Sequence, residues 1–380
     1  MNNKAVKFLK RCIEIYSPSG KEQIYSKFLK NFLEKAKFQT HFDEVGNLIA
    51  EKGKGNPHIL LVSHMDTIPG KLPVIEKRGK IYGRGAVDCK SSLAAMVYAI
   101  KQHDFSKGGK ITFAGIVREE DSLIGINTFL ESNINPDYAI FGEPTQIGQI
   151  CIGYKGRLCF EITIGTEMGH VASSWEYTNA IKLGLEVWKE IKWVCKKLNE
   201  KIKPLNKNTP YFNQVIPNLT VISGGNLTNC IPSKCSLSID IRFPPNIKLN
   251  DILNPTRKVL LKYKKKKLKS GDMVNVNLSI LSQIEGYEID GKNLLIGSLR
   301  WAIFKILQEK PILIKKTGTT FINKIGTVLK IPSITYGPGD PKLEHTKNEF
   351  IEIKDYLKTI EIYLKFFTKL SALYNKRKKR

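Results

Sequence analysis

The chain has 380 residues and an apolar fraction of 42%, enough for one large folded domain and a smaller one, which argues against long-range disorder. Its 61 Lys and Arg against 35 Asp and Glu give a formal charge of +26, which either serves an acidic partner or reflects the codon bias of an AT-rich genome. No apolar stretch approaches the roughly 18 residues of a membrane-spanning helix. The first residues lack a signal-peptide core, so we expect a cytoplasmic protein without membrane contact.

Helical and strand patterns alternate along the first part of the chain. Apolar residues recur at helical spacing over residues 5–16, 23–36 and 91–100. Short apolar runs that are typical of buried strands cover residues 58–62, 111–117 and 138–141. Short buried strands separated by helices indicate an α/β fold with a mainly parallel, doubly wound sheet.

From about Tyr154 the pattern changes to alternating strands at residues 158–164, 218–223 and 235–242, with helices at 177–193 and 249–263. The first pattern resumes near Gly286, with helices at 294–308 and 351–373, strands at 312–315 and 333–336, and a solvated tail at 375–380. We therefore expect a catalytic domain formed by residues 1–153 and 287–380. Residues 154–286 would form an inserted α+β domain.

The seven cysteines are scattered, odd in number and without a C-x-x-C pair. This spacing argues against a disulfide framework or a zinc ribbon. We expect the cysteines to be small packing residues in a reducing compartment.

Candidate metal ligands recur just beyond the predicted strands. They are His64 and Asp66 after the first strand, Glu119 and Glu120 after the second, Glu143 after the third, and His345 beyond the strand at 333–336. Asp88, shortly before the helix at 91–100, adds a further carboxylate. In open α/β sheets ligands bind beyond the carboxyl ends of the strands, so we expect these segments to converge on one crevice.

Two imidazoles and several carboxylates are suitable ligands for two divalent ions. One carboxylate must then bridge the ions, and Asp88 is the natural choice because glycines near it allow close approach of the backbone. The neighbours Glu119 and Glu120 point in different directions, so one can bind metal while the other acts as general base. Each motif alone is a weak indication, but five of them in this order favour a metallohydrolase.

The motifs His64-Met-Asp66, Gly83-Arg-Gly-Ala-Val-Asp88, Glu119-Glu120, Gly142-Glu143-Pro144 and Glu344-His345-Thr346 together resemble those of the dinuclear zinc amidohydrolases. That superfamily includes acetylornithine deacetylase, succinyl-diaminopimelate desuccinylase and carboxypeptidase G. Within it, residues 83–88, 335–339 and 343–346 are most similar to the LysW-lysine/LysW-ornithine hydrolases. Those enzymes release lysine or ornithine from the C-terminal glutamate of a small acidic carrier protein in lysine and arginine synthesis.

The resemblance implies two divalent ions per subunit, with zinc expected and cobalt as the alternative. It implies that His64 and Glu143 bind one ion, that Glu120 and His345 bind the other, and that Asp88 bridges both. Glu119 would be the general base, and Asp66 would orient His64.

The resemblance further implies that the inserted domain is a lid that forms a homodimer. His170 would reach the active site of the partner subunit and stabilise the oxyanion. The implied substrate-carboxylate contacts are Asn229, Arg242, Gly318 and Thr319. Phe321 is a departure, because relatives carry an acidic residue at that position, and this puts the amino-acid preference in doubt.

Other classes of function fit parts of the sequence. A free small substrate, as in acetylornithine deacetylase or succinyl-diaminopimelate desuccinylase, needs no unusual surface, whereas the charge of +26 favours an acidic carrier. An inactive metal-binding scaffold would have no need for Glu119. A nucleic-acid binder would explain the charge, but the basic runs have few interleaved aromatic residues and no recognisable binding module.

Overall fold

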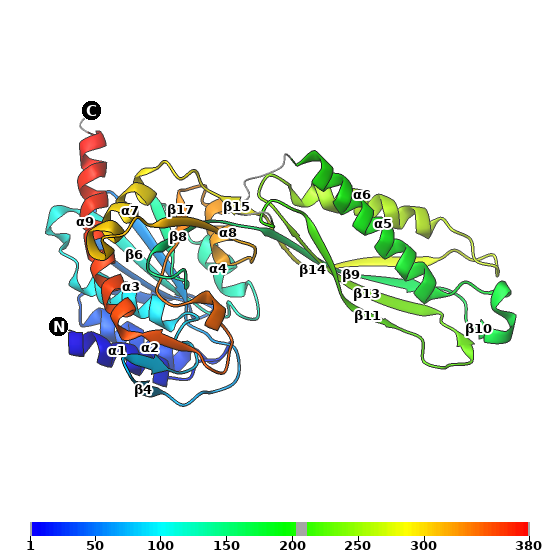
Figure 1. Ribbon diagram of the computed structural model, residues 1–380, viewed down its shortest axis with the longest axis horizontal. Helices are drawn as coiled ribbons and strands as arrows, with labels where there is room; N and C mark the ends of the chain where they lie inside the picture. Colours follow the sequence, from blue (N-terminus) through cyan, green and yellow to red (C-terminus); the bar gives the residue numbers. More distant parts are fainter. Residues whose placement is uncertain (1, 203–210, 379–380) are drawn as a thin grey trace. The chain divides into compact units, whose positions relative to one another are not determined.

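The computed structural model describes residues 2–202 and 211–378 (Figure 1). The chain divides into two compact units. The first unit comprises Met1–Ile152, Ile289–Ile314 and Thr320–Arg380, and the second comprises Gly153–Glu288 and Lys315–Thr319. Within the described residues, no helix is both long and apolar enough to cross a membrane.

The first unit is built on a mixed sheet with a parallel centre. In spatial order its strands are β1 (Gln39–Phe42), β2 (Leu48–Lys54), β6 (Gly109–Ile116), β3 (His58–His64), β7 (Tyr138–Phe141), β17 (Ser333–Thr335) and β8 (Gln149–Tyr154). Strands β6, β3, β7 and β17 run parallel to one another, whereas the pairs β1–β2, β2–β6 and β17–β8 are antiparallel. Strand β3 is buried along its whole length, as expected of a parallel strand covered on both faces. The predicted α/β fold class is confirmed.

Helices cover this sheet in two sets. One set comprises α1 (Asn2–Glu14), α2 (Gln23–Glu34), α3 (Lys90–Gln102), α7 (Leu294–Leu307) and α9 (Ile353–Lys378). Helix α3 packs on β3 and β6 and contacts α1 and α9, so that its apolar face completes the main core. The other set is α4 (Ile124–Glu131) and α8 (Phe321–Val328), which contact each other and pack on β6, β7 and β17.

The remaining short elements of the first unit shape the loops around the sheet. Strands β4 (Ile75–Lys77), β5 (Lys80–Tyr82) and β18 (Phe350–Glu352) form a small antiparallel sheet in the order β18-β5-β4. Single 3-10 turns occur at η1 (Phe105–Lys107) and η3 (Pro341–Leu343). Strand β16 (Ile312–Lys316) pairs with β8, and its last residues belong to the second unit.

The second unit is an antiparallel sheet with two helices on one side (Figure 1). The strand order is β11 (Ile216–Gly224), β13 (Lys234–Phe243), β9 (Gly156–Gly165) and β14 (Asn275–Ile284), and the helices are α5 (Ala180–Lys201) and α6 (Leu249–Lys264). Alternate residues of β9, from Leu158 to Ile164, point into a core shared with both helices. Shorter elements are β10 (Gly169–His170), its partner β12 (Cys230–Ile231), η2 (Val171–Glu176) and β15 (Tyr287–Glu288), which pairs with the end of β8.

The C-terminal segment differs from the prediction. Residues 375–378 are exposed, as expected of a solvated tail, but they continue α9 to Lys378, beyond the helix end expected at residue 373. Residues 379–380 lie outside the described residues. Lysine and arginine are good helix formers, and positive charge near a helix C-terminus interacts favourably with the helix dipole. The basic run Lys376, Arg377 and Lys378 therefore extends the helix instead of ending it.

Candidate metal centre

The register of the parallel strands places the beginnings of several loops at one edge of the sheet. His64 at the end of β3 lies opposite Ile116 on β6, and Val62 lies opposite Phe141 on β7. Phe141 in turn lies opposite Thr335 on β17. The segments that follow these four strands therefore start side by side at the carboxyl edge, where ligands bind in open α/β sheets.

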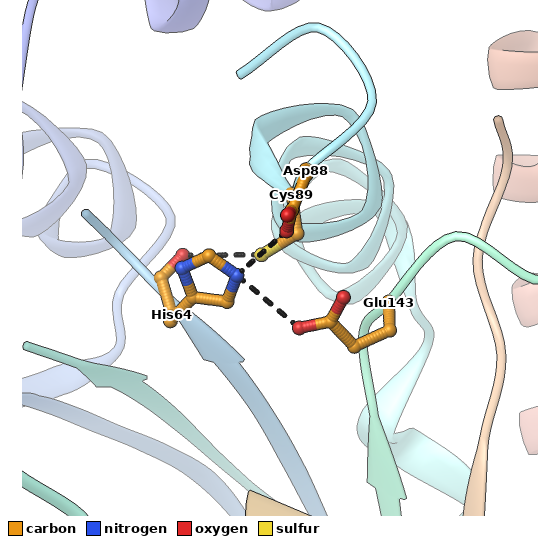
Figure 2. A group of neighbouring side chains, drawn as sticks. All are labelled: His64, Asp88, Cys89 and Glu143. Atoms are coloured by element: carbon orange, nitrogen blue, oxygen red, sulfur yellow. Dashed lines mark hydrogen bonds and ion pairs between the residues drawn. The ribbon is translucent and has the colours of Figure 1, made fainter. Parts of the chain in front are cut away.

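One group of side chains at this edge surrounds His64. Its Nε2 lies 3.0 Å from Asp88 Oδ1 and 3.2 Å from Glu143 Oε1 (Figure 2). All three side chains are buried, so few water molecules can solvate the two carboxylates. An imidazole nitrogen and two carboxylate oxygens at this spacing are suitable ligands for a divalent ion.

A second group uses the other oxygen of Asp88. His345 Nε2 lies 2.9 Å from Asp88 Oδ2 and 3.1 Å from Glu120 Oε1. The His345 backbone has a φ of 63°, a left-handed conformation that is uncommon for a residue with a side chain and that is concentrated at functional sites. Asp88 is therefore the residue common to both groups of potential ligands.

Asp66 holds the first group and the Glu119–Glu120 segment in place. Its Oδ1 lies 3.3 Å from His64 Nδ1 and accepts the Glu119 backbone N–H at 3.0 Å. Its Oδ2 accepts the Glu120 N–H at 3.0 Å and the Ser19 hydroxyl at 2.7 Å. A fully buried carboxylate with these four partners fixes the His64 ring and the course of the loop after β6 together.

Glu119 is held by a residue that the sequence did not identify. The Thr320 hydroxyl, at the N-terminus of α8, donates to Glu119 Oε1 at 3.1 Å. Burial, together with the neighbouring carboxylates Glu143, Asp88 and Glu120, raises the pKa of Glu119 well above its ordinary value. A carboxylate with a raised pKa close to metal-ligand side chains has the properties of a general base.

The electrostatics of the two groups fit divalent cations. The carboxylates Asp88, Glu119, Glu120 and Glu143 converge around two imidazoles. Burial and the charge of Asp88 raise the pKa of Glu143 to about 7, and hydrogen bonds to Asp88 and Glu120 raise the pKa of His345 to about 10. Bound cations would compensate this concentration of negative charge, and the oxygen and nitrogen donors suit zinc or cobalt.

Cys89 adjoins the first group, a position that sequence patterns did not predict. Its Sγ lies 3.3 Å from the His64 carbonyl oxygen (Figure 2). The same Sγ lies 3.0 Å from Ser63 Oγ. Burial raises the pKa of the Cys89 thiol to about 12. Cys89 is fully buried, and its Sγ is a further potential ligand atom of the first group.

The five predicted substrate contacts lie in the second unit, in two separate places. His170 is exposed on β10, which pairs with β12, and Asn229 directly precedes β12 and accepts the Val171 N–H at 3.0 Å. Near the C-terminal end of β13, Arg242 Nη1 donates to Thr319 Oγ1 at 3.1 Å. Gly318 directly precedes Thr319. The structure thus brings together His170 with Asn229, and Arg242 with the 318–319 turn.

Arg242 also belongs to a charged cluster. The Asp240 carboxylate accepts from Arg242 Nε and from Arg157 Nε, each at 2.7 Å. Two guanidinium groups share one carboxylate, which leaves a net positive charge suited to a substrate anion. Phe321 is buried at the start of α8, with its ring 6.1 Å from that of Phe141.

Comparison with known proteins agrees with this geometry. Residues 60–369 match the model of peptidase family M20/M25/M40. The chain is 31% identical over 369 residues to the [LysW]-lysine/[LysW]-ornithine hydrolase of Sulfurisphaera tokodaii, covering 95% of this chain and 94% of that one. It is 34% identical over 374 residues, 97% of each chain, to a Pyrococcus furiosus protein to which the same hydrolase name is given provisionally.

Solved structures share the fold. A tripeptidase from Staphylococcus aureus has a TM-score of 0.79 at 20% identity, covering 98% of this chain and 99% of that one. An M20 family metallo-carboxypeptidase from Sulfolobus solfataricus has a TM-score of 0.78 at 16% identity, covering 97% and 99%. At these identities the likeness concerns the fold alone.

Proposed function

The chain belongs to peptidase family M20/M25/M40 and is a metallohydrolase, and from this premise we propose that it releases lysine or ornithine from an acidic carrier protein. The bond cleaved would be the amide between the amino acid and the C-terminal glutamate of the carrier. The observation that carries this proposal is the pair of ligand groups that share Asp88 beside Glu119. The names of relatives aligned over most of the chain support the choice of substrate.

We propose that two divalent ions bind at the shared site, with zinc expected and cobalt as the alternative. His64 and Glu143 would hold one ion, Glu120 and His345 the other, and Asp88 both. When bound, such ions polarise the scissile carbonyl and lower the pKa of water.

Glu119 would take the proton from the attacking water and return it to the leaving amine. Burial raises the pKa of Glu119 above its ordinary value, which favours proton uptake from water, the first of these steps. Thr320 would orient the Glu119 carboxylate through Oε1, which leaves Oε2 for the water. Asp66 would hold Glu119 and His64 at fixed positions relative to each other, because its carboxylate contacts both residues.

The second unit would act as a lid and dimerisation domain. Asn229, Arg242, Gly318 and Thr319 would bind the substrate carboxylate, and the net positive charge of the Arg157–Asp240–Arg242 cluster supports this role. His170 would stabilise the oxyanion in the partner subunit of a homodimer. The formal charge of +26 would attract the acidic carrier and raise its association rate.

The proposal is tested with a carrier protein whose C-terminal glutamate bears lysine. We expect protein loaded with zinc or cobalt to release free lysine, and metal-stripped protein to regain this activity on reloading. Absence of lysine release by the reloaded protein would contradict the proposal. Tight, salt-sensitive binding of duplex DNA by the same preparation would instead favour a nucleic-acid binder.

A further inference from the structure

A small antiparallel strand pair aligns two segments of the candidate metal centre that are far apart in sequence. On this pair Tyr82 of β5 lies opposite Phe350 of β18. The segment after β5 leads to Asp88, and the segment before β18 starts from His345. The pairing therefore sets the loop that carries Asp88 beside the loop that carries His345.

Glu349 joins the two loops through both of its carboxylate oxygens. Its Oε1 accepts the backbone N–H of Val87 at 2.9 Å and of Asp88 at 3.0 Å. Its Oε2 accepts from Arg84 Nη1 at 2.8 Å. The Glu349 side chain is 1% exposed, so these bonds form without competition from solvent.

Arg84 completes the connection from the other side. Its Nη1 also donates to the carbonyl oxygen of Thr346, the residue after His345, at 3.2 Å, and its Nε donates to the Gly70 carbonyl at 3.1 Å. Glu349 thus binds the backbone of Asp88 directly, and through Arg84 it is connected to the backbone next to His345.

We propose that Glu349, together with Arg84, is a positioning residue that holds the Asp88 carboxylate opposite the His345 imidazole. This inference rests on the proposed metal binding by Asp88 and His345. Asp88 Oδ2 and His345 Nε2 are 2.9 Å apart, and both belong to loops without regular secondary structure of their own. Residues that orient metal ligands typically change metal affinity by about 10- to 100-fold when replaced.

The informative variant is Glu349→Gln. It keeps the size of the side chain, but one of its terminal atoms becomes a donor, so it loses either the pair with Arg84 or the bonds to the Val87 and Asp88 N–H groups. The matched control is Glu352→Gln. Glu352 lies on the same strand pair, and its Oε1 makes an ion pair with Lys80 at 3.2 Å that involves neither loop.

The measurement is cobalt affinity, by competition with a chromophoric chelator, together with the visible spectrum of the bound cobalt. Proteins are first shown to be folded by circular dichroism. We expect Glu349→Gln to weaken binding by about 10- to 100-fold and to alter the spectrum, while Glu352→Gln matches the wild type. Arg84→Lys keeps the positive charge beside Glu349 but loses the planar donor set, and we expect it to shift affinity in the same direction.

Wild-type cobalt affinity and spectrum in folded Glu349→Gln, or in Arg84→Lys if the first variant does not fold, would overturn the inference. Asp88→Ala distinguishes this result from a failure of the proposed function. If Asp88→Ala loses cobalt while the Glu349 variant does not, only the role of Glu349 is wrong. If Asp88→Ala also retains both ions, the ligand assignment itself is wrong.

Discussion

The carboxylate of Asp66 accepts the backbone N–H of Glu119 at 3.0 Å, although the two residues follow different strands of the sheet. The same Asp66 oxygen lies 3.3 Å from His64 Nδ1. One buried group therefore fixes both a proposed ligand and the proposed general base. A displacement of Asp66 would disturb metal binding and proton transfer together, as expected of a group that orients metal ligands.

Glu119 is the first point at which the account can be tested. Glu119→Gln removes the base but keeps the hydrogen-bond acceptor for the Thr320 hydroxyl. We expect kcat to fall by at least about 100-fold, the usual scale for general acid–base catalysis, while both metal ions stay bound. Turnover near the wild-type rate, measured with metal content verified, would remove Glu119 from this role.

Asp88 is the only proposed ligand that contacts both imidazoles, through Oδ1 and Oδ2 respectively. Asp88→Ala should therefore lose tight binding of both ions. Glu143→Ala and Glu120→Ala should each mainly weaken one ion. Metal analysis of the purified variants decides the matter, and two ions per chain in Asp88→Ala would refute the bridging role.

Metal binding should release protons, because the pKa values of the proposed ligands His64, Glu143 and His345 are all raised in the metal-free protein. The pKa of Glu143 is raised to about 7, chiefly by burial, and the pKa of His345 to about 10, chiefly by its hydrogen bond to Asp88. Both must lose their protons to bind a cation, so metal affinity should rise from pH 6 to pH 8. Calorimetric titration in buffers of different ionisation enthalpy counts these protons, and Glu143→Gln should release fewer.

The same shifts determine how the stability of the metal-free protein depends on pH. The folded-state pKa of Glu143 lies above its ordinary value of 4.5, and the pKa of His345 lies above its ordinary value of 6.5. Each group contributes its full stabilisation of the folded state at a pH below its pKa in the unfolded chain. The contribution of Glu143 is lost as the pH rises through about 7, and that of His345 is lost as the pH rises through about 10. The Tm gain on adding metal should therefore increase between pH 6 and pH 8. A constant gain would contradict these shifts.

Hydrophobic periodicity located the strand ends near which the candidate ligands lie. His64, Glu120, Glu143 and His345 follow buried strands, and the structure places them around Asp88. Their binding of metal ions stays a prediction. Thr320 and Glu349 were not predicted, because their contacts arise only in the folded structure. Glu349, for example, is 265 residues from its partner Arg84.

The fold was predicted less completely at its exposed strands. Strand β14 (Asn275–Ile284) has polar Asn, Ser and Gln side chains at most of its exposed positions and buries few residues, so it lacks a continuous apolar run. Strands β1 and β2 were missed because they are partly exposed and contain Glu, Lys and Gln. Strands of this kind, with polar and exposed positions, form through pairing with a neighbour, which periodicity does not reveal.

His170 offers a test of the proposed homodimer. If His170 completes the active site of the partner subunit, then His170→Ala and Glu119→Gln inactivate different halves of each composite site. Mixing the two variants should restore part of the activity, because some sites then contain both intact residues. Lack of recovery in dimers shown to be mixed would mean that His170 does not act across the interface.

The central claim concerns the substrate, and the most direct measurement compares kcat/KM for three amides on one enzyme preparation. These are carrier-linked lysine, N-acetylornithine and N-succinyl-diaminopimelate, each assayed with the same metal loading. We predict that the carrier-linked amide is preferred by about 100-fold or more, the scale on which a few specific contacts discriminate between substrates. Equal or faster hydrolysis of either free small molecule would contradict the account.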